Sequence, residues 1–227
     1  MRHKVAIRFT IEGDLRYISH HDTMRLFERA LARARIPVRF SEGFNPRPRI
    51  SLPVPRTVGV GSEADLLIVD LTEPVDPSDL LERLGSQMPA GLRLTEAWKL
   101  DTRTPPQPEE VEYVVQVPPD REAEISAAVN QLMACRSRII QRASLAGKPA
   151  RTVDLRVFLV RAKVEAGLLR WVVRAGNEGS VRPSEILAAV GLDEQLLLHR
   201  VRRTEIVWQT EPAFPKRAAQ NNERPQA

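Results

Sequence analysis

The residues best suited to proton transfer and anion binding lie in two neighbouring segments, YISHHDTMRLFERALARARIPVRF and SEGFNPRPRISLPVP. In the first, His20 and Asp22 follow Ser19 at a predicted helix start, where free backbone N–H groups and the helix dipole favour an anion. The same position lowers the proton affinity of a histidine, so a neutral His20 could act as a general base. The alternative is that Ser19 and Asp22 only cap the helix and that His20 is a surface residue.

Three arginines follow in the same predicted helix. Arg25, Arg29 and Arg33 lie at positions i, i+4 and i+8, so a helix places them in one stripe. A stripe of guanidinium groups can face phosphates. The alternative is an ordinary solvated helix face.

The second segment is a loop whose prolines and glycine restrict its backbone, and such loops with polar tips often bind a ligand. Arg47 and Arg49 flank a proline and would direct two guanidinium groups at an anion. We expect Phe44 to anchor the loop in the core, with stacking on a base as the alternative. The predicted binding residues are Ser19, His20, Asp22, Arg25, Arg29, Ser41, Gly43, Phe44, Asn45, Arg47 and Arg49.

The composition excludes several kinds of site and of protein. Cys135 is the only cysteine, so an intramolecular disulfide or a zinc or iron–sulfur site held by cysteines of this chain is excluded. The four histidines lack metal-ligand spacing, and the chain has no P-loop, so we expect no metal and no cofactor. No apolar run reaches the roughly 18 residues of a membrane span and no secretory signal is visible, so we expect a cytoplasmic protein that does not bind membranes.

Positive charge is concentrated near the N-terminus. The chain has a net charge of +5, with 29 arginines and 5 lysines. Residues 1–50 contain 11 Lys or Arg and 5 Asp or Glu, whereas residues 51–100 contain 4 and 8. The preference for arginine suits phosphate recognition, although a GC-rich genome produces the same bias.

Apolar periodicity predicts the same order of elements in both halves of the chain. In the first half we expect strands at 3–11, 38–40, 65–73 and 92–100, a helix at 20–35 and a helix from 76 to 88. In the second we expect strands at 111–117, 153–159, 168–173 and 201–208, and helices at 125–135 and 183–190. We therefore predict an α+β fold of two tandem ferredoxin-like (βαββαβ) domains with antiparallel sheets. The predicted boundaries are domains at 1–101 and 111–208, a proline-rich linker at 102–110 and a mobile tail at 209–227.

The motifs SHHD, RLFERALARARIPVRFSEGFNPRPRIS and VGVGSEAD resemble the radical SAM-linked protein family, over roughly Lys4 to Glu73. In that family a domain of this kind is fused to, or encoded beside, a cobalamin-binding-type radical SAM protein. The resemblance implies a radical SAM partner and matches His20 and Asp22 to an S-H-x-D element, with Ser41 to Arg49 as its S-x-G-F-N-P-x-P loop. His21 stands where the family pattern has leucine, and Arg47 where many members have histidine, which argues against a metal or proton-transfer role shared by the two segments.

The function we expect is that of a noncatalytic accessory protein, because a radical SAM cluster needs three closely spaced cysteines. It would bind RNA, either tRNA or rRNA, and present it to the radical SAM partner for modification. One alternative is an RNA-processing endoribonuclease, in which His20 would be the base that acts on a ribose 2′-hydroxyl. Another is an adaptor that binds only the partner protein.

Overall fold

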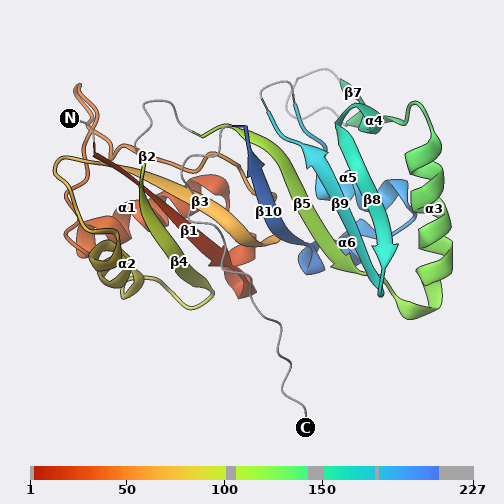
Figure 1. Cartoon of the computed structure of the whole chain (residues 1–227), viewed down its shortest axis with the longest axis horizontal. Helices are drawn as coiled ribbons and strands as arrows, with labels where there is room; N and C mark the ends of the chain where they lie inside the picture. The colour runs from red at the N-terminus through yellow and green to blue at the C-terminus, as the bar shows by residue number, and fades with distance from the viewer. Residues whose placement is uncertain (1–2, 101–105, 143–150, 177–178, 210–227) are drawn as a thin grey trace, which may run out of the picture.

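The computed structural model describes residues 3–100, 106–142, 151–176 and 179–209 of the chain. It is a mixed α/β structure built on one large sheet in which antiparallel pairs dominate, with strand order β4-β1-β3-β10-β5-β9-β8 (Figure 1). A short eighth strand, β2, pairs with β3, and β6 and β7 form a separate two-stranded sheet. The expectation of a mixed fold with mainly antiparallel strands is therefore confirmed.

The first half of the chain supplies one side of the large sheet. Its elements are β1 (His3–Ile11), α1 (His20–Arg33), β2 (Ile50–Ser51), β3 (Gly61–Leu71), α2 (Pro77–Gly85) and β4 (Leu92–Leu100), with a 3-10 turn η1 (Gly13–Tyr17). Alternate residues of β1 face the two helices, and Phe9 meets Phe27 of α1 edge to face, with ring centroids 5.0 Å apart. This packing fixes α1 against the sheet.

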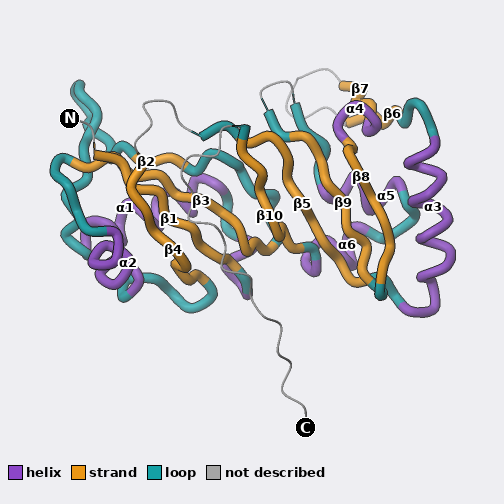
Figure 2. The backbone as a smooth tube through the Cα atoms, viewed as in Figure 1, coloured by secondary structure: helices purple, strands orange, loops and turns teal. Residues whose placement is uncertain are grey.

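The second half begins with β5 (Pro108–Gln116) and ends with β10 (Arg202–Trp208). Between them lie η2 (Pro119–Arg121), α3 (Glu122–Ala134), β6 (Ile139–Arg142), β7 (Arg151–Asp154), α4 (Leu155–Phe158), β8 (Leu159–Glu165), β9 (Leu168–Arg174), α5 (Pro183–Ala189), α6 (Glu194–Leu197) and η3 (Leu198–Arg200). Figure 2 shows β10, β5, β9 and β8 continuing the large sheet of the first half.

The two halves meet where β10 pairs with β3 in parallel, at Arg202 with Gly61 and Arg203 with Ser62. The hydrophobic core also crosses this boundary. One cluster of buried residues includes Ala6 and Ile68 of the first half together with strands and helices of the second, whereas the α1 and α2 side of β1 and β3 forms its own cluster. The halves are thus joined by both backbone and side-chain contacts.

Several boundaries differ from those predicted. The expected strand at 38–40 is reduced to isolated bridges at Val38 and Phe40. The expected strand at 153–159 is wrong, because the Asp154 carboxylate accepts a hydrogen bond from the Arg156 N–H (3.0 Å) and starts a helical turn, α4, at Leu155. Part of the predicted linker is strand, since β5 begins at Pro108. Residues 102–105 of that linker and 210–227 of the predicted tail lie outside the described residues.

Candidate functional site

The start of α1 is built by Ser19 and Asp22. Ser19 is the N-cap, and its hydroxyl accepts a hydrogen bond from the Asp22 N–H (3.1 Å) and donates one to the Asp22 carboxylate (2.6 Å). The first hydrogen bond satisfies one of the free N–H groups of the helix end. The hydrogen bond from Ser19 holds the pKa of Asp22 below its ordinary value, with a smaller contribution from Arg25. Both side chains therefore act as capping groups.

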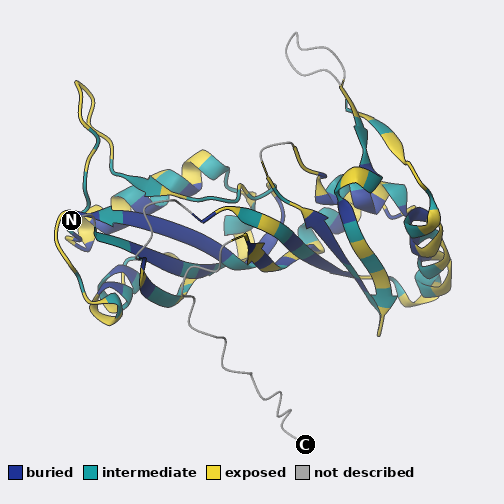
Figure 3. Ribbon diagram, turned by 45° about the horizontal axis from the view of Figure 1, so that its top comes forward, coloured by how far each residue is buried: buried dark blue, intermediate teal, exposed yellow. Residues whose placement is uncertain are grey.

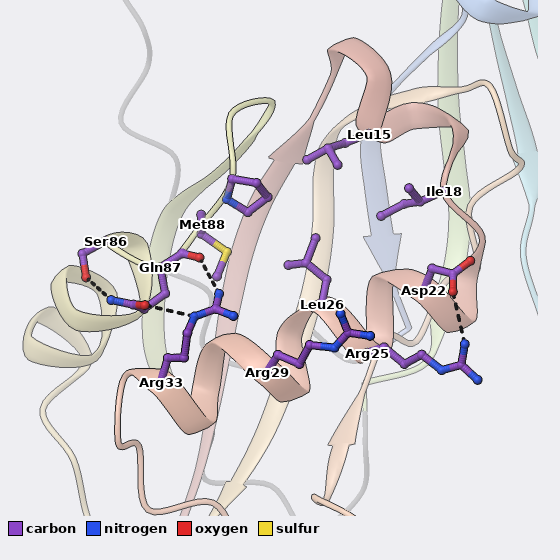
Figure 4. Close-up of a pocket in the computed structure, with 11 residues that line it drawn as sticks. Leu15, Ile18, Asp22, Arg25, Leu26, Arg29, Arg33, Ser86, Gln87 and Met88 are labelled. Carbon is purple, nitrogen blue, oxygen red and sulfur yellow. Dashed lines mark hydrogen bonds and ion pairs between the residues drawn. The ribbon is translucent and has the colours of Figure 1, made fainter.

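A groove of about 440 Å³ runs along α1, and the predicted arginine stripe lines it. Figure 4 shows the side chains of Arg25, Arg29 and Arg33 in a row on the helix, with Leu15, Ile18, Leu26 and Met88 around them. Arg25 forms an exposed pair with Asp22 (3.4 Å). Arg33 donates to the side-chain and backbone oxygens of Gln87, both at 3.1 Å.

The charge of this groove is unbalanced. Its described lining contains three arginines and one carboxylate, that of Asp22. The side chain of Arg29 is exposed and has no hydrogen bond or ion pair with another described residue. The groove therefore presents positive charge to solvent, and at least one guanidinium group is free to bind an anion.

His20 faces away from this groove, toward a separate small cavity. The cavity measures about 10 Å³, and its lining includes Thr23, Val54, Arg56 and Asp65. A volume of about 10–15 Å³ holds one water molecule, so this cavity has no room for a substrate, although His20 itself is only half-buried. Burial lowers the pKa of His20, as do His21 and Arg56 to a smaller extent, whereas Asp65 opposes the shift.

Behind His20 lies a buried cluster of charged residues that was not predicted from the sequence. Arg203 of β10 has no exposed surface and forms an ion pair with Asp65 of β3 at 2.9 Å. Arg56 lies 3.7 Å from the other oxygen of Asp65 and donates hydrogen bonds to the backbone carbonyls of Arg16 and Val60. Ser62 also donates to Asp65, at 2.5 Å. Ser62 and Asp65 belong to the VGVGSEAD motif, but no motif or local spacing could have indicated their contact with Arg203, which is 138 positions from Asp65.

The loop of the SEGFNPRP motif forms a projecting hairpin-like arm. The Ser41 N–H donates to the Arg47 carbonyl (2.8 Å), and the Arg47 N–H donates to the Ser41 hydroxyl (3.0 Å). At its base, the backbone N–H of Arg49 donates to Arg39 (2.8 Å). In Figure 3 the arm projects beyond the sheet near the N-terminus and is exposed over most of its length.

Phe44 lies at the exposed end of this arm, with a relative exposure of 106%. The expectation that it anchors the loop in the core is therefore wrong. The hydrogen-bonded arm carries residues 42–47 beyond the sheet, so no apolar surface is within reach of the ring. Gly43, with φ of +125°, Asn45 and Arg47 are exposed beside it.

The structure brings together only part of the predicted site. Asp22, Arg25 and Arg29 line the groove with Arg33, while His20 lies in the small cavity beside Asp65. The arm follows the opposite end of α1 from His20, and a helix of 14 residues is about 20 Å long. The sequence-predicted residues thus form three separate places and not one.

The described residues include no group of three or more His, Cys, Asp or Glu side chains that could hold a metal ion. None of the described helices is both long and apolar enough to cross a membrane.

Comparisons with known proteins give one family. A family model with the description "Uncharacterized protein conserved in bacteria (DUF2344)" matches residues 4–183. No curated protein matches the chain. Among solved structures, the acetolactate synthase small subunit from Thermotoga maritima is 14% identical, with 92% of this chain and 96% of that chain covered and a TM-score of 0.26. An unknown protein from Galdieria sulphuraria is 13% identical, with 92% and 100% covered and the same TM-score of 0.26.

Proposed function

The chain belongs to the DUF2344 family, described as "Uncharacterized protein conserved in bacteria", and we propose from its site geometry that it is a noncatalytic accessory protein that binds RNA. The RNA, either tRNA or rRNA, would be presented to a radical SAM enzyme for modification. The observation that carries the RNA-binding step is the row of Arg25, Arg29 and Arg33 along an open groove whose described lining contains a single carboxylate.

The spacing of these arginines suits a phosphate backbone. Successive members of the row are four residues apart, which on a helix corresponds to an axial separation of about 6 Å. This is similar to the distance between neighbouring phosphates of a nucleic acid strand, and guanidinium groups bind phosphate oxygens in a bidentate manner. The apolar residues between them, Leu26 and Met88, offer surface for ribose or base contacts.

The radical SAM partner rests on the resemblance of the SHHD and SEGFNPRP motifs to the radical SAM-linked family. The geometry around His20 favours the endoribonuclease alternative less, because His20 does not line the groove that contains the arginine row and the cavity beside it holds about one water molecule. A noncatalytic role fits this arrangement better.

A second candidate function, docking on a partner protein, is favoured by Phe44. Its ring is fully exposed at the end of an arm whose backbone is held by hydrogen bonds between Ser41 and Arg47. An exposed aromatic side chain on a preorganised arm can fill a pocket of a partner protein at low entropic cost. This function is compatible with RNA binding, since the arm and the groove are separate surfaces.

We also infer that each half of the chain is a ferredoxin-like unit. The second half contributes β5, β8, β9 and β10 to the large sheet, in the spatial order β10-β5-β9-β8. The last of these strands, β10, lies beside the first, β5, and β8 lies at the edge. The first half has the corresponding order β4-β1-β3, with β2 on the free side of β3. The repeated order supports a tandem arrangement in which β10 occupies the part of the β3 edge that β2 leaves open.

RNA binding is tested by fluorescence anisotropy with total tRNA and with rRNA fragments, at several salt concentrations. We expect the logarithm of the affinity to fall linearly with the logarithm of the salt concentration, and the Arg25→Ala/Arg29→Ala variant to bind at least tenfold more weakly with a slope reduced by about 1 to 2. The Arg136→Ala/Arg138→Ala variant is the matched control, because it removes two exposed arginines from the loop after α3. Equal binding by both variants, or binding that does not depend on salt, would exclude the groove as the RNA site.

A further inference from the structure

A second cleft, of about 360 Å³, lies where the two halves of the chain meet. The segment between β2 and β3 contributes Val54 and Pro55, and the second half contributes Tyr113 of β5 and Val173 of β9. Small-molecule sites have volumes of roughly 300–1000 Å³, are mostly apolar and often lie between structural units. The residues of the predicted binding site do not line this cleft, so it is a separate candidate site.

Among the described residues that line this cleft, the charged ones are all basic. They are Arg174 and Arg182, and no described aspartate or glutamate lines it. Both arginines are exposed. Arg174 has no ion pair or side-chain hydrogen bond with another described residue, so its guanidinium group is free to bind a ligand.

A buried positive charge lies directly behind one wall of the cleft. The guanidinium group of Arg203 donates to the carbonyls of Val54 (3.1 Å) and Pro55 (2.9 Å), two residues that line it. Arg203 also lies over the ring of Tyr113, with its Cζ 5.9 Å from the ring centroid. Two parts of the cleft lining, the Val54–Pro55 segment and Tyr113, are therefore in contact with the buried guanidinium group of Arg203.

This cation is not fully neutralised. Among the described residues, Asp65 is the only carboxylate within ion-pair distance of either Arg203 or Arg56. Two guanidinium groups thus share one carboxylate in a buried place, where the low dielectric strengthens and extends their field. The Nε of Arg203 is in addition buried without a hydrogen-bond partner. The cluster leaves an excess of one positive charge behind a cleft whose described lining includes no acidic residue.

We propose that this cleft binds a small organic anion with an apolar or aromatic body. The body packs against Tyr113 and Val173, and the anionic group binds Arg174 and Arg182 at the rim. The uncompensated charge of the Arg56, Asp65 and Arg203 cluster favours an anion over a neutral molecule of the same shape. This site does not depend on RNA binding in the groove along α1.

The test uses 8-anilinonaphthalene-1-sulfonate, an aromatic sulfonate whose fluorescence increases in apolar surroundings, titrated into the full-length protein. We expect saturable binding at one site. The Arg174→Ala/Arg182→Ala variant should bind the probe about tenfold more weakly or worse, because it loses the charge-assisted hydrogen bonds to the sulfonate. The Arg136→Ala/Arg138→Ala variant removes the same charge from the loop after α3 and should bind the probe as the parent protein does.

Two further measurements distinguish the proposal from unspecific dye binding. The Ser180→Glu variant places a carboxylate in the lining and should weaken binding of the sulfonate, with circular dichroism and thermal unfolding showing that the fold is kept. N-phenyl-1-naphthylamine, which lacks the sulfonate, should bind at least tenfold more weakly than the anion. No saturable binding, equal affinity for the two dyes, or unchanged affinity in the Arg174→Ala/Arg182→Ala variant would overturn the proposal.

Discussion

Arg203 and Asp65 form an ion pair of 2.9 Å across the boundary between the two halves of the chain, 138 positions apart in the sequence. Both side chains are buried, with relative exposures of 0% for Arg203 and 6% for Asp65. Arg203 pairs with Ser62 of β3 through its backbone. Its side chain also donates two hydrogen bonds to the carbonyls of Val54 and Pro55, in the segment between β2 and β3. The ion pair and these hydrogen bonds tie the last strand to the first half.

The first prediction concerns the carboxylate of this pair. Asp65→Ala should lower the free energy of unfolding by about 3–5 kcal/mol, because it leaves Arg203 and Arg56 buried without a counter-charge. Urea denaturation followed by circular dichroism measures this loss. Glu63→Ala is the control, since the Glu63 pair with Arg202 is exposed and pairs of that kind contribute only about 0–1 kcal/mol. An equal loss in the free energy of unfolding in the two variants would show that the buried pair stabilises the fold no more than an exposed pair does.

The second prediction tests whether Ser19 caps the start of α1. Ser19→Ala should lower the free energy of unfolding by about 1 kcal/mol, because the Asp22 N–H loses its hydrogen-bond acceptor. Ser51→Ala, at an exposed strand position, should leave stability within about 0.5 kcal/mol of the parent protein. Stability that does not change in Ser19→Ala would contradict the capping role.

The local elements could largely be predicted from the sequence. The alternation of Val5, Ile7 and Phe9 predicted β1, and Ser19 with the helical spacing of Phe27 and Leu31 predicted α1, because these signals depend only on near neighbours in the chain. The arginine stripe was likewise predicted, since helical periodicity alone places Arg25, Arg29 and Arg33 in one row.

The long-range features could not be predicted in this way. The pairing of β10 with β3 and the ion pair between Arg203 and Asp65 join distant residues with no shared local pattern. Phe44 was placed in the core by its hydrophobicity, although the hydrogen-bonded arm carries it into solvent. The strand expected at 153–159 failed because the capping of α4 by Asp154 outweighed the apolar alternation.

The third prediction uses Asp22, the only carboxylate among the described residues that line the groove along α1. Asp22→Asn should raise the affinity for RNA by about twofold to tenfold at low salt, because it removes one negative charge beside Arg25. Salt titrations with the same tRNA and rRNA probes measure the change. Asp79→Asn, on the exposed face of α2, should have a much smaller effect. Weaker binding by Asp22→Asn would mean that its carboxylate contacts the ligand directly.

The fourth prediction concerns the exposed ring at the end of the arm. Phe44→Ala should leave the free energy of unfolding within about 0.5 kcal/mol of the parent value, because the ring buries no surface. If the arm docks on a radical SAM enzyme as proposed, the same variant should lose capture of that enzyme by the tagged protein after nuclease treatment, with Val58→Ala, another exposed apolar position, as the control. Undiminished capture by Phe44→Ala would exclude the ring as the docking contact.

The fifth prediction is a pH dependence of stability that comes from His20. Burial lowers its pKa in the folded protein, so the folded state takes up its proton at a lower pH than the unfolded chain, in which histidine titrates near about 6.5. As the pH falls through about 6.5, the unfolded chain is protonated first, and the free energy of unfolding decreases until the pH reaches the lowered pKa. Urea midpoints measured between about pH 7.5 and 5 should therefore fall less in His20→Gln than in the parent protein. His199→Gln, a histidine in η3, controls for the loss of a histidine elsewhere. Identical slopes for the parent protein and His20→Gln would contradict a lowered pKa of His20 in the folded protein.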